Sequence, residues 1–423
     1  MSRGSNPGDG QGVSFSQLLR TNQNFRRIWV GEVASWLGDW FNAIAIYTLV
    51  RSLTGSPFAL GLVFLTKMLP FAVASPLAGL LVDRFDRRRL MIAADLLRAL
   101  LVLGFLLVDD AGDLYLIYVL TTLQVFLTAV FIPARSASIP NVTSRRELLT
   151  ANALSAATWS TLLAVGAALG GFATEWLGVR AVFVIDSATY VISAIFLART
   201  VIPQKTELGS GRGLRAVLSD TADGWRHMRA NPHIGRMAFA KATWALGGGA
   251  LVYMLAIMGE EVAAGAPAVG IGVLFAARGL GTGIGPLAVR KWLPNELKWP
   301  LLVGVGVVAS GVSYMMVGAI SWSVWILLLV VFAHAPSGAN WVASSVLLQK
   351  RTLDRYRGRV FATEWLLVTL ADSLSILTAS LLMEAGVLSL RSGILLYGGV
   401  QVLCGLAWIV LVVPKERQAV TPT

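Results

Sequence analysis

The stretch "GLLVDRFDRRRL", residues 79–90, places a dense cluster of charges between two long apolar runs. The first run stops at Asp83, four arginines follow within the next six residues, and apolar sequence resumes at Leu90. Runs of about 20 apolar residues are long enough to cross a bilayer, and a short basic loop between two of them favours the cytoplasmic side. The stretch therefore predicts two membrane-spanning helices joined by a cytoplasmic turn.

The composition of the whole chain is that of an integral membrane protein. Of 423 residues, 56% are hydrophobic and 14% are charged, whereas soluble domains carry about 25% charged residues. The net charge of +12 comes from short basic clusters between apolar runs, so it does not indicate nucleic-acid binding. The single cysteine, Cys404, lies in an apolar run and predicts neither a disulfide nor a metal site.

Twelve apolar runs are long enough to span a membrane, in two sets of six, and predict an all-α membrane protein. The runs are 28–53, 58–82, 90–108, 113–134, 150–176 and 179–199, then 236–260, 267–290, 299–319, 322–348, 359–385 and 391–413. The predicted organisation is a tail at 1–27, a half at 28–199, a linker at 200–235, a half at 236–413 and a tail at 414–423. The linker is polar and basic, with one amphipathic helix expected near 213–230.

The lysines and arginines are distributed unevenly between the two sides of this layout. With the N-terminus inside, 28 of the 35 fall in inner segments and only three, Arg51, Arg180 and Arg391, in outer loops. Basic residues concentrate in cytoplasmic loops of membrane proteins. The first 27 residues contain no apolar segment of the signal-peptide type. We therefore expect a multi-pass protein of the inner (plasma) membrane with both termini in the cytoplasm.

Two of the predicted spans repeat a short pattern. Gly61, Phe64, Lys67 and Leu69 in span 2 match residues of span 8 at a constant offset of 211. The matching residues are Gly272, Phe275, Arg278 and Leu280. Each half therefore places a basic residue at the same position inside a helix, which indicates a duplicated unit with a binding site between the repeats.

The opening stretch resembles the cytoplasmic signature of the major facilitator superfamily, in which Gly, Asp-Arg and a basic cluster join spans 2 and 3. Gly79, Asp83, Arg84, Arg87 and Arg88 match that pattern, while Asp86 stands where the family often has glycine. The stretches "NFRRIWVGEVASWLGDW", "VDRFDRRRLMIAADLLRAL" and "PARSASIPNVTSRRELLTANAL" are similar to the bacterial drug, macrolide and siderophore exporters of this superfamily. The resemblance implies the twelve-helix major facilitator fold and transport by alternating access.

The resemblance also implies a gating role for the signature. Asp83 would face the start of span 11, near residues 358–361, and the arginines would bridge to neighbouring acids. An anion is stabilised at a helix N-terminus. In the family this contact holds the outward-facing state.

Ionisable side chains inside the spans are the candidates for function, because a charge at the bilayer centre costs about 3 kcal/mol or more. The candidates for proton coupling are Asp39, Asp186, Asp372, Glu32 and Glu364. Asp39 is the main candidate, and its alternative role is a permanent ion pair with Lys67 or Lys241. Glu32 and Glu364 lie near the inner surface, which favours gating or structure for both.

The intramembrane cations and tryptophans are the candidates for the substrate cavity. Lys67, Lys241, Arg278 and Arg135 either neutralise the acids or contact an anionic substrate. Trp36, Trp40, Trp244 and Trp341 either line a cavity for flat hydrophobic molecules or pack against helices and lipid.

The sequence predicts a secondary transporter rather than an enzyme. It contains no phosphate-binding loop, no hydrolase elbow and no zinc-protease motif, and we expect no cofactor and no metal, with energy taken from a proton gradient. The favoured function is proton-coupled efflux of an amphipathic molecule such as a macrolide-like drug or a siderophore. The alternatives are import of a nutrient or lipid on the same fold, and a transporter-like sensor. The expected partners are a small-molecule substrate and membrane lipid, with no nucleic acid, for a monomeric protein.

Overall fold

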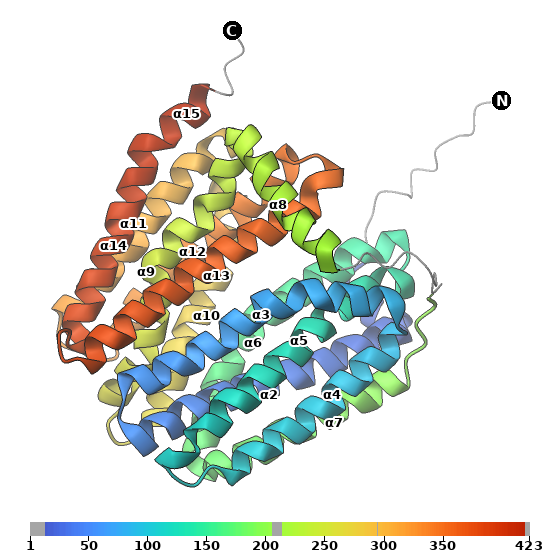
Figure 1. The fold of residues 1–423 in the computed structure, drawn as a ribbon, viewed down its shortest axis with the longest axis horizontal. Helices are drawn as coiled ribbons and strands as arrows, with labels where there is room; N and C mark the ends of the chain where they lie inside the picture. The colour runs from blue at the N-terminus through green and yellow to red at the C-terminus, as the bar shows by residue number, and fades with distance from the viewer. Residues whose placement is uncertain (1–12, 205–213, 294, 419–423) are drawn as a thin grey trace.

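A computed structural model describes residues 13–204, 214–293 and 295–418 (Figure 1). The first half contains α2 (Gln23–Thr54), α3 (Pro57–Arg84), α4 (Arg87–Gly104), α5 (Leu114–Val142), α6 (Arg145–Leu177) and α7 (Val179–Ala198). The second half contains α9 (Pro232–Val262), α10 (Pro267–Trp292), α11 (Trp299–Ala319), α12 (Ile326–Arg351), α13 (Asp354–Glu384) and α14 (Leu390–Leu411). The shorter helices are α1 (Phe15–Thr21), α8 (Leu214–Ala230) and α15 (Val413–Gln418).

The twelve long helices coincide with the twelve predicted spans, which confirms the predicted fold class. Within the described residues, 11 helices are both long enough and apolar enough to cross a membrane. The remaining long helix, α2, has Glu32, Asp39 and Asn42 in its interior, and these polar residues lower its hydropathy. It packs against α6 and α7 inside the first half, where these polar side chains find protein partners.

The predicted hairpin at residues 79–90 is a connection of only two residues, Phe85 and Asp86, between α3 and α4. Asp86 caps α4, because its carboxylate accepts a hydrogen bond of 2.8 Å from the backbone nitrogen of Arg89. A carboxylate at a helix N-terminus also interacts favourably with the helix dipole. The departure from glycine at this position therefore has a local structural reason.

The two halves meet along two helix pairs, α6 with α10 and α3 with α13 (Figure 1). Glycines allow α6 and α10 to approach each other closely. A Cβ on Gly171 would lie 2.5 Å from the backbone oxygen of Ala268. A Cβ on Gly279 would lie 2.6 Å from the backbone nitrogen of Ala164. Small residues let helix backbones approach in membrane proteins. The glycines of α6 and α10 thus allow the two halves to pack at backbone distance.

Polar contacts between the halves gather at one end of the bundle. Arg51 forms an ion pair of 3.0 Å with Glu260, and the hydroxyl of Ser56 donates a 2.7 Å hydrogen bond to Glu384. The hydroxyl of Tyr253 donates to the backbone oxygen of Pro57 at 2.7 Å. These residues lie at the ends of α2, α3, α9 and α13, so we call this the closed end of the molecule.

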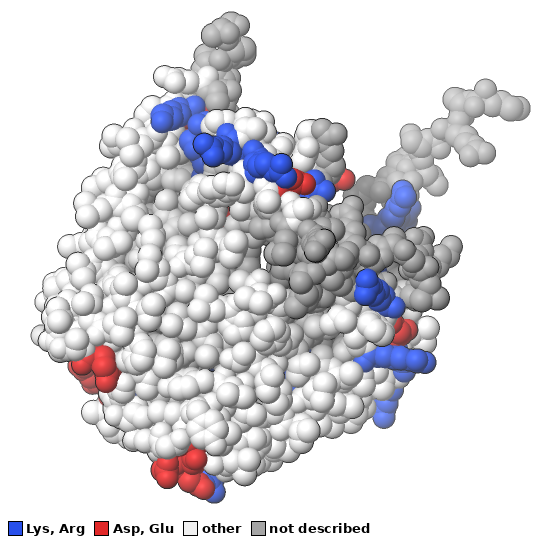
Figure 2. All heavy atoms as spheres, in the orientation of Figure 1, with Lys and Arg blue, Asp and Glu red and all other residues white. Residues whose placement is uncertain are grey.

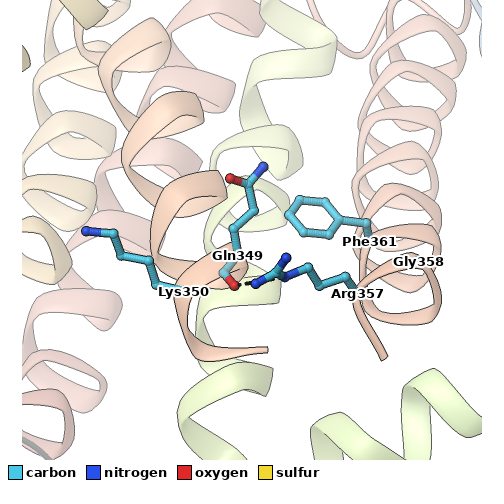
Figure 3. A pocket seen from close by; sticks show the side chains of 5 residues that line it. All are labelled: Gln349, Lys350, Arg357, Gly358 and Phe361. Atoms are coloured by element: carbon cyan, nitrogen blue, oxygen red, sulfur yellow. Dashed lines mark hydrogen bonds between the residues drawn. The ribbon is translucent and has the colours of Figure 1, made fainter. Parts of the chain in front are cut away.

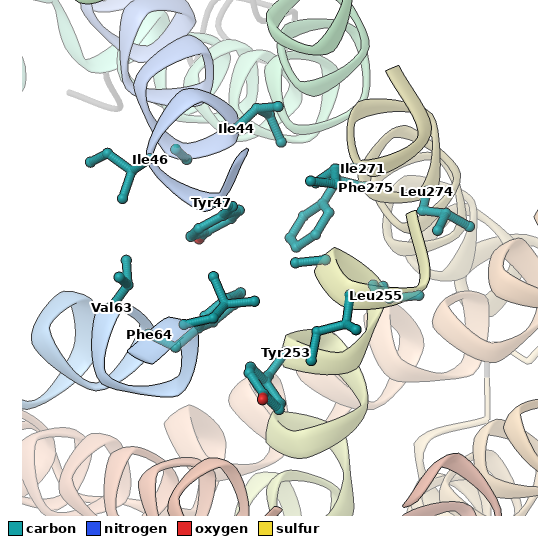
Figure 4. Close-up of a cluster of buried hydrophobic side chains, with 14 of the residues drawn as sticks. Ile44, Ile46, Tyr47, Val63, Phe64, Tyr253, Leu255, Ile271, Leu274 and Phe275 are labelled. Atoms are coloured by element: carbon teal, nitrogen blue, oxygen red, sulfur yellow. The ribbon is translucent and has the colours of Figure 1, made fainter. Parts of the chain in front are cut away.

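A cluster of aromatic rings lies beneath these contacts and fills the space between the halves (Figure 4). Tyr47 stacks on Phe64 with centroids 4.6 Å apart, and Phe64 meets Tyr253 edge to face at 5.7 Å. Phe275 of the second half lies 5.9 Å from Tyr47. Buried aromatic pairs of this geometry add to the apolar burial that holds the halves together.

The opposite end of the bundle carries basic residues (Figure 2). There the linker helix α8 packs on α13: a Cβ on Gly224 would lie 2.6 Å from the backbone oxygen of Arg359. The ring of His227 stacks on that of Tyr356 with centroids 4.0 Å apart. We call this the basic end. The helix expected near 213–230 is therefore present, docked on the second half.

We predict that Gly171→Leu destabilises the protein, because the new side chain overlaps the backbone of α10. Overpacking of this kind costs about 1–3 kcal/mol of unfolding free energy. Thermal unfolding of the purified variant in detergent measures the effect. The control is Gly399→Leu, at a helical glycine whose Cβ would meet nothing within 4 Å. Equal stability of the two variants would contradict close packing of α6 on α10.

Candidate functional site

A cavity of about 620 Å³ lies in the first half of the protein, among α2, α3, α5 and α6. Its wall combines aromatic rings, neutral polar groups and charges. The lining residues are Trp36, Asp39, Trp40, Asn42, Ala43, Tyr47, Lys67, Thr121, Gln124, Val125, Thr128, Phe131, Ile132, Arg135 and Trp159. Five of the residues predicted from the sequence, on three different helices, therefore surround one cavity. They are Asp39, Lys67, Arg135, Trp36 and Trp40.

Asp39 is held by a neutral partner rather than by a cation. Its carboxylate accepts a hydrogen bond from the hydroxyl of Tyr190 on α7, and that hydroxyl accepts a 2.9 Å bond from the side-chain amide of Gln124. Neither Lys67 nor Lys241 forms an ion pair with Asp39 in this conformation, since Lys241 pairs with Glu364 and Lys67 contacts no carboxylate of the described chain. The permanent ion pair considered as an alternative is thus absent here.

Asp186 lies behind the cavity wall on α7 and is fully buried. The amide of Asn42, which lines the cavity, donates a 2.7 Å hydrogen bond to its carboxylate. The hydroxyl of Thr189 lies 3.4 Å from its other oxygen. Asp186 is therefore separated from the cavity by one side chain, and Asn42 connects the two.

A buried ion pair supports the tyrosine that holds Asp39. Arg98 pairs with Asp95, three residues earlier on α4, and both are buried. The guanidinium lies between two rings, 4.4 Å from the centroid of Tyr190 and 4.6 Å from that of Phe131. Cation–π contacts of this kind position the ring. Arg98 therefore acts on the site through Tyr190.

Glu32 and Arg135 form a second buried ion pair, from α2 to α5. Arg135 also donates a hydrogen bond of 2.6 Å to the hydroxyl of Ser155 on α6, and its guanidinium lies 5.6 Å from the ring of Trp36. The pair thus ties three helices of the first half together beside the cavity. This arrangement accounts for a structural contribution from Glu32.

Lys241 and Glu364 form the corresponding pair in the second half, between α9 and α13. The ion pair measures 2.9 Å, and the ammonium also donates to the hydroxyl of Ser345 at 2.8 Å. It lies 4.4 Å from the ring of Trp341, which meets Trp365 edge to face. Trp341 is therefore the aromatic partner of a paired lysine and is not among the residues that line the cavity.

The other candidates in the second half are not among the residues that line that cavity. One oxygen of Asp372 is buried without a hydrogen-bond partner in the described part of the chain, and α9 covers it at Gly249. The indole nitrogen of Trp244 lies 3.4 Å from the hydroxyl of Ser310. Arg278 lies 5.9 Å from the ring centroid of Phe275. Asp372 and Arg278 form no ion pair with a described residue, although each carries a charge that acts on the other at longer range.

In this conformation Arg87 and Arg88 bind backbone carbonyls among the described residues, so the expected bridges to acids in the outward-facing state stay a prediction. A guanidinium nitrogen of Arg87 donates to the backbone oxygen of Ala137 at 2.8 Å, and Arg88 donates to that of Leu197 at 3.1 Å. These carbonyls lie near the C-terminal ends of α5 and α7, where backbone oxygens lack helical partners and the dipole favours cations. Arg84 is exposed at the end of α3.

The expected contact between Asp83 and the start of α13 falls outside the described side chains, as does Gly79. At the start of α13, a pocket of about 460 Å³ lies between α12 and α13 at the basic end (Figure 3). It is lined by Gln349, Lys350, Arg357, Gly358 and Phe361. Lys350 pairs with Glu296 at 2.6 Å and Arg357 with Asp354 at 2.8 Å, so both cations are already neutralised.

Sequence reasoning missed the neutral polar residues of the cavity. Gln124, Thr121 and Thr128 line it, and Tyr190 connects Gln124 to Asp39. A side-chain amide within an apolar run needs a hydrogen-bond partner in the bilayer. Gln124 stands in such a run, "LYLIYVLTTLQVFLTAVF", so its position could have predicted a polar site.

We predict that Arg135→Met lowers the unfolding free energy by about 3–5 kcal/mol, because it leaves the Glu32 carboxylate buried without its cation. The double variant with Glu32→Gln recovers most of that loss. Denaturant titration of the purified protein measures both. The control is Arg180→Met, which removes an exposed pair with Asp109 and changes stability by less than about 1 kcal/mol. A double variant no more stable than Arg135→Met would contradict the pairing.

Proteins of similar sequence include named exporters. The chain is 24% identical over 349 residues to a protein assigned as a bacilysin exporter, BacE of Bacillus subtilis, covering 82% of this chain and 85% of that one. It is 23% identical over 361 residues to macrolide efflux protein A of Streptococcus pyogenes, covering 84% and 88%. An uncharacterized transporter, YfiS of Bacillus subtilis, is 28% identical over 219 residues, a match that spans 51% of each chain, about half the length of that relative.

Solved structures share the fold at low sequence identity. The nucleoside transporter NupG superposes with a TM-score of 0.68 at 12% identity, covering 92% of this chain and 99% of that one. A bacterial homolog of the lysosomal transporter Spinster, in an inward-facing and unoccupied conformation, gives 0.66 at 16% identity, covering 93% and 96%. The profile of the Major Facilitator Superfamily matches residues 28–363. The chain therefore belongs to the Major Facilitator Superfamily and is a membrane transporter rather than an enzyme.

Proposed function

We propose that this transporter exports an amphipathic small molecule in exchange for protons, by alternating access. The observation that carries the proposal is the cavity of about 620 Å³, which combines tryptophan rings with an acid, Asp39, that forms no ion pair among the described residues. Ligand sites of transporters lie near the midplane between repeats. A cavity of several hundred Å³ is of the size that binds small molecules.

Asp39 is suited to carry a proton because its partner is neutral. A carboxylate paired with an arginine stays charged, and its protonation would strand a buried cation. Asp39 accepts from the hydroxyl of Tyr190, so it can take up a proton without leaving such a cation. Asp186, bonded to Asn42, has the same property and is the second candidate. Glu32 and Glu364 are paired with cations and serve structure.

The proposed orientation places the basic end in the cytoplasm, following the distribution of lysine and arginine. The contacts of Arg51 with Glu260 and of Ser56 with Glu384 then close the outer side. The cavity would accept substrate from the inside in this state. Rocking of the halves about the α6–α10 and α3–α13 contacts would break the outer contacts and release substrate outward.

The proposed substrates are macrolide-like drugs or siderophores, and the two relatives named as exporters support export rather than import. The aromatic wall formed by Trp36, Trp40 and Trp159 suits a large apolar surface. We propose that the protein acts as a monomer in a plasma membrane, since the two halves together enclose the transport path.

The proposal is tested in proteoliposomes with an imposed pH gradient. Addition of erythromycin or a siderophore is expected to release protons across the membrane through the wild-type protein. We predict that Asp39→Asn abolishes this substrate-dependent proton movement, because the amide cannot carry a proton, while its thermal stability stays near that of the wild type.

The matched control is Glu261→Gln, which removes an exposed carboxylate from the closed end and leaves proton movement unchanged. Proton movement that persists in Asp39→Asn would remove Asp39 from the coupling path and leave Asp186 as the candidate. Absence of proton movement with any compound, in protein shown to be folded, would overturn proton coupling.

A further inference from the structure

Five lysine or arginine side chains of the described residues lie inside the helical bundle away from its ends, and they divide into two groups. Three contact a carboxylate: Arg98 with Asp95, Arg135 with Glu32, and Lys241 with Glu364. The other two, Lys67 and Arg278, have no hydrogen bond or ion pair with any described residue. The guanidinium nitrogen Nε of Arg278 is buried without a partner.

These two cations occupy equivalent places in the two halves. Lys67 on α3 and Arg278 on α10 each follow a phenylalanine by three residues, Phe64 and Phe275, and both phenylalanines belong to the ring cluster of Figure 4. Both helices run from the closed end toward the basic end, so each cation lies about one helical turn beyond the rings on the side of the basic end.

Tyr47 connects the two positions. The ammonium of Lys67 lies 6.0 Å from its ring centroid, and the ring of Phe275, over which Arg278 lies at 5.9 Å, is 5.9 Å from Tyr47. Tyr47 and Lys67 both line the cavity. The two cations, one from each half, therefore lie beside the ring cluster formed by Tyr47, Phe64 and Phe275, on the side that faces the basic end.

An unpaired cation inside the bilayer is costly, and such residues mark the binding of an opposite charge. Contacts with aromatic rings compensate only part of the lost hydration. Neither Lys67 nor Arg278 contacts a carboxylate of the described residues, although Asp39 and Asp186 act on Lys67 and Asp372 acts on Arg278 at longer range. Each cation can therefore bind the negative charge of a ligand without first breaking an ion pair.

We propose that the substrate is a zwitterion whose carboxylate binds between Lys67 and Arg278 and whose ammonium binds Asp39. This inference rests on the proposed transport function and narrows its class of amphipathic substrates to molecules that carry both a carboxylate and an ammonium. Asp39 lines the same cavity as Lys67 and lacks a cationic partner, so the site offers both charges at once. An ammonium at Asp39 competes with the proton there, which is the condition for exchange. A carboxylate joined to both cations also links the two halves.

The test uses three dipeptides that differ only in charge: L-leucyl-L-phenylalanine, its methyl ester, which lacks the carboxylate, and its N-acetyl derivative, which lacks the ammonium. Isothermal titration calorimetry on the purified full-length protein, without a gradient, measures each affinity. The variants are Lys67→Met and Arg278→Met, with Lys298→Met, at an exposed lysine in the turn before α11, as the matched control.

We predict that the wild type binds the zwitterion more tightly than either derivative. Lys67→Met and Arg278→Met should each weaken zwitterion binding by about tenfold or more while changing methyl-ester binding less than about twofold. Lys298→Met should change neither. Since neither replaced cation contacts a carboxylate, no ion pair is broken and both variants should fold. Thermal unfolding of each variant is measured alongside, so that lost binding can be told from unfolding.

Equal weakening of zwitterion and methyl ester would overturn the proposal, and so would binding of none of the three peptides. The outcome is separable from that of the proposed function, because calorimetry needs neither a gradient nor a direction. Failure here with erythromycin-driven proton movement intact would leave proton-coupled export standing. Charge-selective peptide binding without proton movement would support the zwitterion site and overturn the coupling.

Discussion

The free-energy cost of a charge without a partner in hydrocarbon determines how the charged side chains inside this protein are arranged. Acids and bases inside the helices would each cost several kcal/mol if left alone, and the fold gives most of them a specific partner. Three contacts, Arg98 with Asp95, Arg135 with Glu32 and Lys241 with Glu364, neutralise cations with carboxylates. Five charges inside the described bundle form no ion pair: Asp39, Asp186, Asp372, Lys67 and Arg278. Asp39 and Lys67 line the cavity, and Asp186 lies behind its wall. We therefore expect function at the charged side chains that no ion pair within the protein neutralises.

The contacts between the two halves separate the closed end of the molecule from the side on which the cavity lies. Glycines at the α6–α10 contact let the backbones touch, and the ring cluster of Tyr47, Phe64 and Phe275 fills the gap toward the closed end. Above the rings the cavity begins. A joint made of small residues and flat rings can be repacked by rotation of rigid halves, which is what alternating access needs.

Much of the fold was predictable because the bilayer restricts the choices. In hydrocarbon every backbone group must be bonded within its own segment, so an apolar run of 20 residues can only be a helix. The predicted hairpin at residues 79–90 and the linker helix, observed as Leu214–Ala230, followed from such local patterns. The signature arginines were less predictable: Arg87 and Arg88 bind helix-end carbonyls, which any sequence carries and no motif reveals.

The residues that are ionisable within the membrane could be predicted from the sequence, because a charge in an apolar run is visible without a structure. The sequence therefore nominated Asp39, Lys67 and Arg278 as candidates. Their partners could be identified only in the folded bundle: Lys241 pairs with a glutamate more than a hundred residues away, while Lys67 contacts no carboxylate of the described residues. The reason is physical. Compensation is a contact property, set within a few ångströms between helices that meet only in the folded bundle.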